Sequence, residues 1–171
     1  MLRSLGPAAS ALLAPQPDAV AEVRDALDDG WPAAALELLA GGWREQLTAA
    51  AALALSGAAS FIADSSGALA VALWRAIDGA SWVAPQLVAA ALLADPGFEP
   101  RAAERLTAAG RRPPKTIGAL VRAYNRCPAR RMPVVAQLGV HDRTMATEEA
   151  RIGVRGVDGW LDYFGAISRS S

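Results

Sequence analysis

The chain has 171 residues, of which 53% are hydrophobic but only 6% aromatic, so most of its apolar content is Ala, Leu and Val. This composition supplies a buried core, argues against extensive disorder and favours helices, because Ala and Leu are strong helix formers. A single cysteine excludes an internal disulfide and a thiolate metal cluster, and the formal net charge is zero. We therefore expect one all-α domain in a reducing compartment.

Prolines and glycines mark the ends of the predicted helices, because proline is tolerated in a first helical turn and glycine favours a C-terminal cap. In chain order, the predicted helices cover residues 17–29, 32–40, 43–55, 67–77, 81–94, 100–109 and 115–126. Ser65 or Ser66 is a candidate cap for the fourth helix, and Ser81 for the fifth. The connections between these predicted helices are short, and short connections predict antiparallel helix pairs.

The C-terminal part of the chain has a weaker pattern. Residues 132–140 fit either a short helix or a strand, whereas Thr147 followed by two glutamates is typical of a helix start. Glycine recurs along this last helix, and because glycine has a low helix propensity, we expect the helix to be only weakly stable. These glycines are Gly153, Gly156 and Gly159, and a final amphipathic face consists of Trp160, Leu161, Phe164 and Ile167.

Two segments of the chain resemble each other at a spacing near 40 residues. The stretch "GGWREQLTAAAALALSG" (41–57) matches "GASWVAPQLVAAALLADPG" (79–97), and the helices that precede them match as well. One helix pair cannot bury both of its faces, so repeated pairs stack. The spacing predicts short antiparallel helix pairs stacked as a HEAT-like α-solenoid over residues 1–131. Residues 132–171 are predicted to be a C-terminal extension packing on the same domain.

No catalytic or cofactor motif is found in the sequence, which lacks a P-loop, a dinucleotide fingerprint and a nucleophile elbow. His141 is the only histidine, and together with the adjacent Asp142 it supplies too few ligands for a metal shell. Cys127 is flanked by arginines, but a catalytic cysteine needs a base and His141 is the only one available to it. We predict no catalytic, cofactor-binding or metal-binding residues and no enzymatic activity.

Charge is distributed unevenly along the chain. Residues 1–98 hold 4 basic and 10 acidic side chains, whereas residues 99–155 hold 12 basic and 5 acidic ones. Residues 101–131 form a basic stripe that contains a single acid, Glu104. Such a stripe could bind an acidic protein or nucleic acid, or it could simply be a face exposed to solvent. The zero net charge of the chain argues against nucleic acid. The nucleic-acid alternative uses Arg101, Arg105, Arg112, Arg122 and Arg126.

The candidate partner-binding residues fall into two groups. Trp43, Arg44, Trp82 and Gln86 lie on the second helices of the repeats and have the composition of interface hot spots, although core packing is the alternative for each tryptophan. Asp28 and Asp29 end a predicted helix, where acids oppose the helix dipole, and form a candidate acidic plug.

Residues 46–63 carry no charge, and these 18 residues approach the length of a membrane span. Their Ser, Thr and Gly content favours a buried helix instead. Residues 1–17 are interpreted as an N-terminal helix in preference to a cleaved signal. We therefore expect a cytoplasmic protein without a membrane segment.

Residues 17–126 resemble HEAT-like α-solenoids. Within them, "ALWRAIDGASWVAPQLVAAALLADPGFEPRA" followed by "RPPKTIGALVRAY" is similar to bacterial immunity proteins that accompany polymorphic or type VI secreted toxins. Proteins of that class bind a cognate toxin domain and block its active site. The resemblance implies a cytoplasmic, non-enzymatic protein without a cofactor, whose partner is a toxin. It transfers no individual contact residue, and a generic helical scaffold or adaptor remains the alternative.

Overall fold

The computed structural model describes residues 6–27, 31–64, 66–79, 82–108, 112–128 and 142–170, and this part of the chain is helical and contains no strand. The all-α prediction is confirmed for these residues. The elements are the 3-10 helix η1 (Gly6–Leu12) and the α-helices α1 (Pro17–Asp25), α2 (Trp31–Ala40), α3 (Trp43–Ser56), α4 (Ala59–Ala63), α5 (Ala68–Gly79), α6 (Ala84–Ala94), α7 (Phe98–Thr107), α8 (Pro114–Arg126), α9 (Asp142–Met145) and α10 (Glu148–Ser170).

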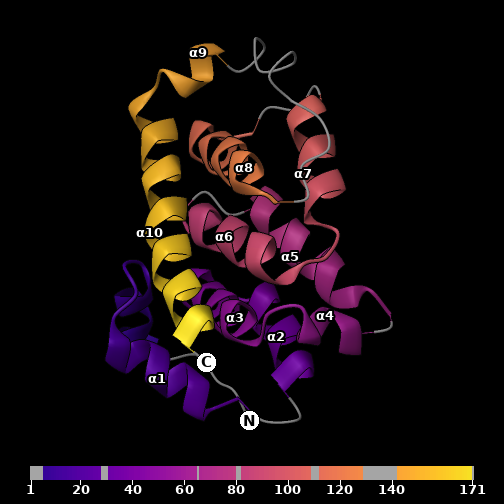
Figure 1. Cartoon of the computed structure of the whole chain (residues 1–171), viewed down its shortest axis with the longest axis vertical. Helices are drawn as coiled ribbons and strands as arrows, with labels where there is room; N and C mark the ends of the chain where they lie inside the picture. The colour runs from indigo at the N-terminus through magenta and orange to yellow at the C-terminus, as the bar shows by residue number, and fades with distance from the viewer. Residues whose placement is uncertain are drawn as a thin grey trace.

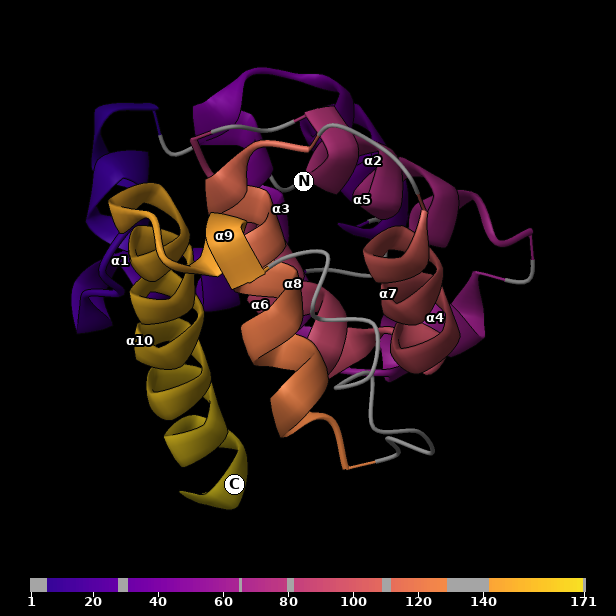
Figure 2. The same ribbon diagram turned by 90° about the horizontal axis from the view of Figure 1, so that it is seen from above.

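The helices are arranged in three layers, which Figure 2 shows from above. The outer layer contains α2, α5 and α7, and the middle layer contains α3, α6 and α8. Helix α10, with η1 and α1, forms the third layer against the other side of the middle one. Each outer helix packs against the middle helix that follows it in the chain, so α2/α3, α5/α6 and α7/α8 are successive helix pairs.

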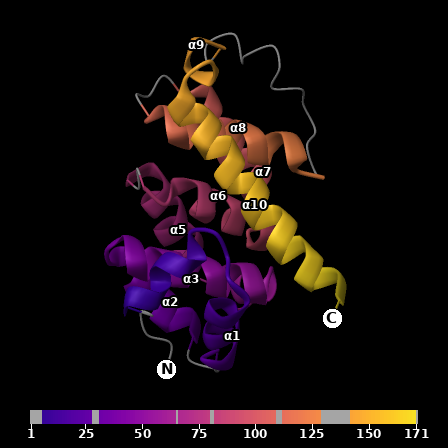
Figure 3. The same ribbon diagram turned by 90° about the vertical axis from the view of Figure 1, so that its left-hand side faces the viewer.

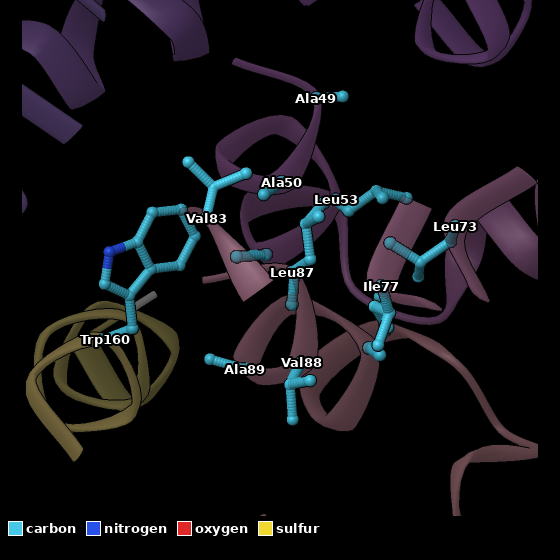
Figure 4. Close-up of a cluster of buried hydrophobic side chains, with 14 of the residues drawn as sticks. Ala49, Ala50, Leu53, Leu73, Ile77, Val83, Leu87, Val88, Ala89 and Trp160 are labelled. Atoms are coloured by element: carbon cyan, nitrogen blue, oxygen red, sulfur yellow. The ribbon is translucent and has the colours of Figure 1, made fainter. Parts of the chain in front are cut away.

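The middle layer explains the alanine-rich segments of the sequence. Residues 47–54 of α3 and 84–91 of α6 are all buried, because these helices have neighbours on both faces. A helix enclosed in this way has to be apolar around its whole circumference, and small side chains let its neighbours approach closely. The two segments matched in the sequence lie in α3 and α6, which pack side by side. Figure 4 shows this core where α3, α5 and α6 meet Trp160 of α10.

Helix α10 differs from the sequence-based expectation. It runs unbroken for 23 residues through all four of its glycines, crossing α8 and α6 and reaching α3 (Figures 1 and 3). A Cβ atom at Gly153 would collide with the carbonyl oxygen of Lys115, and one at Gly118 of α8 would collide with the backbone of Ala150. A Cβ atom at Gly156 would lie 2.7 Å from that of Pro85. The glycines therefore permit close helix packing, which offsets their low helix propensity.

The last turns of α10 join the third layer to the core. Trp160 and Phe164 are buried with their ring centroids 4.9 Å apart. The indole Nε1 of Trp160 donates a hydrogen bond to the carbonyl oxygen of Leu12 at 2.9 Å, which fixes η1 beside α10. None of the described helices combines the length and the apolar character that crossing a bilayer requires.

Two further details refine the predicted helix starts. The backbone N–H of Leu69 in α5 donates to the carboxylate of Asp64 at 2.6 Å, and the predicted cap Ser66 accepts a longer bond from Ala68 N–H at 3.2 Å. Helix α6 begins at Ala84, later than the predicted start at residue 81, and Val83 is at its N-cap position. Pro85 lies in the first turn, as predicted. The predicted cap Ser81, the ambiguous residues 132–140 and His141 lie outside the described residues.

Candidate protein-binding site

Two helix pairs bring two tryptophans together at one surface hollow. Leu13, Trp43, Trp82 and Val83 line a space of about 220 Å³, which we call the tryptophan socket. Trp43 begins α3, and Trp82 and Val83 lie in the turn that leads into α6. Because α3 and α6 pack side by side, residues 39 positions apart in the sequence line the same hollow.

Trp82 is the most unusual residue of the socket. Its side chain is 74% exposed, whereas tryptophan is normally among the most buried residues of a folded protein. Leu13 is also exposed, Trp43 is half-buried, and Val83 is buried at the base, where Figure 4 shows it near the core. The socket therefore presents an apolar aromatic surface to the solvent on a buried support.

A cation lies on each tryptophan of the socket. The guanidinium carbon of Arg44 is 4.3 Å from the centroid of the Trp43 ring. The Nζ atom of Lys115 is 5.3 Å from the Trp82 ring and donates to the Trp82 carbonyl oxygen at 2.8 Å. Burial lowers the pKa of Lys115, and the negative charge of Glu149 partly opposes that shift. Among the described residues, no carboxylate forms an ion pair with Arg44 or Lys115.

Gln86 is placed differently from the other predicted contacts. It is only 6% exposed, and its Nε2 atom donates to the carbonyl oxygen of Leu13 at 3.2 Å. Leu13 is a lining residue, so Gln86 supports one wall of the socket from within the fold. Its Oε1 atom is buried and has no hydrogen-bond partner among the described residues. The structure thus brings together Trp43, Arg44 and Trp82, with Gln86 behind them, whereas Asp28 and Asp29 lie outside the described residues.

The five arginines of the basic stripe that the structure describes do not share one open face. Arg101 pairs with the buried Asp95, and Arg105 and Arg112 both pair with Asp78 of α5. Two others face α10 instead, where they pair with Asp158: Arg122 at 2.7 Å and Arg126 at 3.0 Å. The hydrogen bond to Asp158 raises the pKa of Arg122, consistent with a well-formed pair. All five side chains named for nucleic-acid binding therefore have carboxylate partners within the chain, which sequence spacing alone does not reveal.

A second hollowed surface runs along α5, and we call it the α5 face. It joins a hollow of about 660 Å³ between α2 and α5 to one of about 570 Å³ between α5 and α7. Val71 and Arg75 line both hollows. The sequence contains a signal for this face, because Val71 lies off the buried Leu69, Leu73 and Ile77 stripe of the helix.

The described residues include no group of His, Cys, Asp or Glu side chains placed to hold a metal ion. Cys127 is a half-buried free thiol at the end of α8.

Comparison with protein-family models, with curated proteins and with solved structures finds no match to this chain in any of the three.

Proposed function

We propose that this protein is a non-enzymatic binding module that holds a partner protein through the tryptophan socket. The observation that carries the proposal is Trp82, which is 74% exposed beside Trp43 in a shared hollow. Tryptophan and arginine dominate the binding energy of protein interfaces. At about 220 Å³, the hollow is smaller than the ~300–1,000 Å³ of a typical small-molecule site, so it fits one side chain of a larger partner.

The finer proposal is an immunity protein with a HEAT-like α-solenoid. Its support is the repeated pairing of α2/α3 and α5/α6, together with the resemblance of residues 72–102 and 112–124 to immunity proteins of secreted toxins. In this proposal the partner is a toxin that acts in the cytoplasm. The chain covers the catalytic cleft of the toxin and so blocks access of its substrate.

Co-expression with the protein encoded by the neighbouring gene tests this function. We expect the wild-type chain to restore growth of cells that produce the neighbour and to co-purify with it. Trp82→Ala is expected to weaken both effects, because it removes the exposed half of the socket. Ile62→Ala is the matched control, since Ile62 is 76% exposed but lies in α4, away from the socket. Absence of both rescue and co-purification for the wild type would contradict the proposal.

A helical adaptor is the second candidate function, and the α5 face favours it. A surface separate from the socket would let the chain contact two proteins at once. The variants Val71→Asp and Trp82→Ala distinguish the two functions. An adaptor loses a different partner with each variant, whereas a single-partner inhibitor retains its one complex when Val71 is changed.

A further inference from the structure

The shape of the tryptophan socket limits what can enter it. Its lining is entirely apolar apart from backbone and indole N–H groups, and its volume of about 220 Å³ accommodates one large side chain. Tryptophan rings contribute wide, rigid walls that lose little conformational entropy on binding. The natural occupant is therefore a single bulky apolar side chain, either aromatic or leucine-like.

The charges beside the socket restrict the residues on either side of that anchor. Arg44 is exposed and offers its guanidinium donors above Trp43. Lys115 uses one of its three donors on the Trp82 carbonyl oxygen, which leaves two for a ligand. Within the described residues, neither cation has a carboxylate in ion-pair contact, and Glu149 acts on Lys115 only from a longer range.

We propose that the tryptophan socket recognises a partner segment in which one bulky apolar side chain is flanked by carboxylates. The apolar side chain enters between Trp43 and Trp82, and the carboxylates pair with Arg44 and Lys115. A basic segment would meet two like charges, which is costly at an interface. This inference rests on the proposed function, since it takes the socket as the contact surface and adds the chemistry of the segment that the socket selects.

Titration of the full ¹⁵N-labelled chain with synthetic peptides tests this preference. The probes are three capped heptapeptides: one with a central phenylalanine between two pairs of glutamates, one with alanine in place of phenylalanine, and one with lysines in place of the glutamates. The acidic phenylalanine peptide is expected to shift the indole N–H resonances of Trp43 and Trp82 and to bind at least about tenfold more tightly than either other peptide.

The buried tryptophans supply controls within the same spectrum. The Trp74 indole donates to Asp95 at 2.7 Å and the Trp160 indole donates to Leu12, so both resonances are expected to stay in place. Equal or tighter binding of the lysine peptide, changes centred on Trp74 or Trp160, or no change with any peptide at millimolar concentration would each overturn the inference.

Charge reversal provides a second readout. Arg44→Glu is expected to weaken binding of the acidic peptide at least about tenfold and to strengthen binding of the lysine peptide. The fold should tolerate this change, because an acid is favourable in the first turn of α3. Arg75→Glu makes the same charge change on the α5 face and should leave both affinities within about twofold.

If Trp82→Ala abolishes partner binding while the peptides show no acidic preference, only this inference fails. If Trp82→Ala leaves the partner bound, the proposed function itself fails.

Discussion

Asp95 connects three parts of the structure through one buried carboxylate. It is 5% exposed and accepts hydrogen bonds from Trp74 Nε1 at 2.7 Å, from Gly97 N–H at 2.8 Å and from Arg101 Nη1 at 2.7 and 2.9 Å. These contacts tie α5 to the turn between α6 and α7. Removing one partner from such a buried network lowers the free energy of unfolding, because the remaining donors lose their protein acceptor and cannot reach water instead.

Replacement of Asp95 should therefore destabilise the fold. We expect Asp95→Ala to lower the free energy of unfolding by about 3 kcal/mol, the lower end of the range for breaking a buried pair, because Arg101 is partly exposed. Asp162→Asn is the control, since its carboxylate is 69% exposed and such a pair contributes under ~1 kcal/mol. Urea titration followed by circular dichroism measures both. Similar losses for the two variants would show that Asp95 has no special role.

Asp64 gives a prediction that depends on pH. The hydroxyl of Ser66 and the backbone N–H of Leu69 donate to its carboxylate and hold its pKa below the ordinary value. The carboxylate therefore stabilises the folded chain above the unfolded pKa of ~3.9, and this contribution is lost as the pH falls through the lower folded pKa. We expect the wild type to unfold at higher urea than Asp64→Asn at pH 7, and the difference to shrink towards pH 3. A difference that stays constant over this range would exclude the predicted linkage.

At the residue scale, the sequence does not predict how exposed each tryptophan is. The sequence singles out Trp43, Arg44 and Trp82, and in the structure Trp43 and Trp82 line one hollow while Arg44 stacks on the Trp43 ring. It did not separate Trp82 from Trp74, which lies in the middle of α5 and is buried against Phe98 with ring centroids 5.7 Å apart. That difference depends on which neighbouring helix covers each ring, and local sequence does not contain this information.

At the scale of elements, α10 shows where propensity misleads. Pro and Gly marked most of the helix ends in the first 126 residues, because local backbone rules decide those positions. Gly153 and Gly156 of α10 instead allow close contacts with α8 and α6, which are distant in sequence. The short helix α4 was not predicted either, since residues 59–63 form a single isolated turn without clear caps.

A pair of glycine substitutions separates packing from propensity. Gly153→Ala is expected to destabilise the chain by about 1–3 kcal/mol, because its methyl group would collide with the carbonyl oxygen of Lys115. Gly159→Ala, where no atom lies within 4 Å of the added methyl group, is expected to stabilise the chain by about 0.5–1 kcal/mol. Thermal unfolding of the two variants measures the contrast. Shifts of the same sign would show that α10 does not approach α8 as closely as described.

At the scale of the whole molecule, the fold neutralises the charge asymmetry of the sequence. The acid-rich first half supplies Asp78 and Asp95 to arginines of the basic stripe, and α10 supplies Asp158. Sequence shows the asymmetry but not these pairings, which form only when the layers assemble. Arg44 and Lys115 stand apart, because within the described residues they stack on tryptophans without an ion-paired carboxylate.

The socket should contribute to binding without being needed for folding. Trp82→Ala removes an exposed ring, so the free energy of unfolding should fall by no more than about 1 kcal/mol, mainly through the lost contact with Lys115. Chemical unfolding of the variant checks this expectation. A much larger loss would assign Trp82 to the core of the fold rather than to a contact surface.

The most direct test is isothermal titration of the neighbouring gene's product with the wild-type chain, Trp82→Ala and Ile62→Ala. Loss of an interface hot spot of about 2 kcal/mol corresponds to roughly a 30-fold weaker complex, and this is the result expected for Trp82→Ala. Ile62→Ala should change the affinity less than about threefold. Equal affinity of Trp82→Ala and the wild type would contradict the claim that the tryptophan socket is where this protein binds its partner.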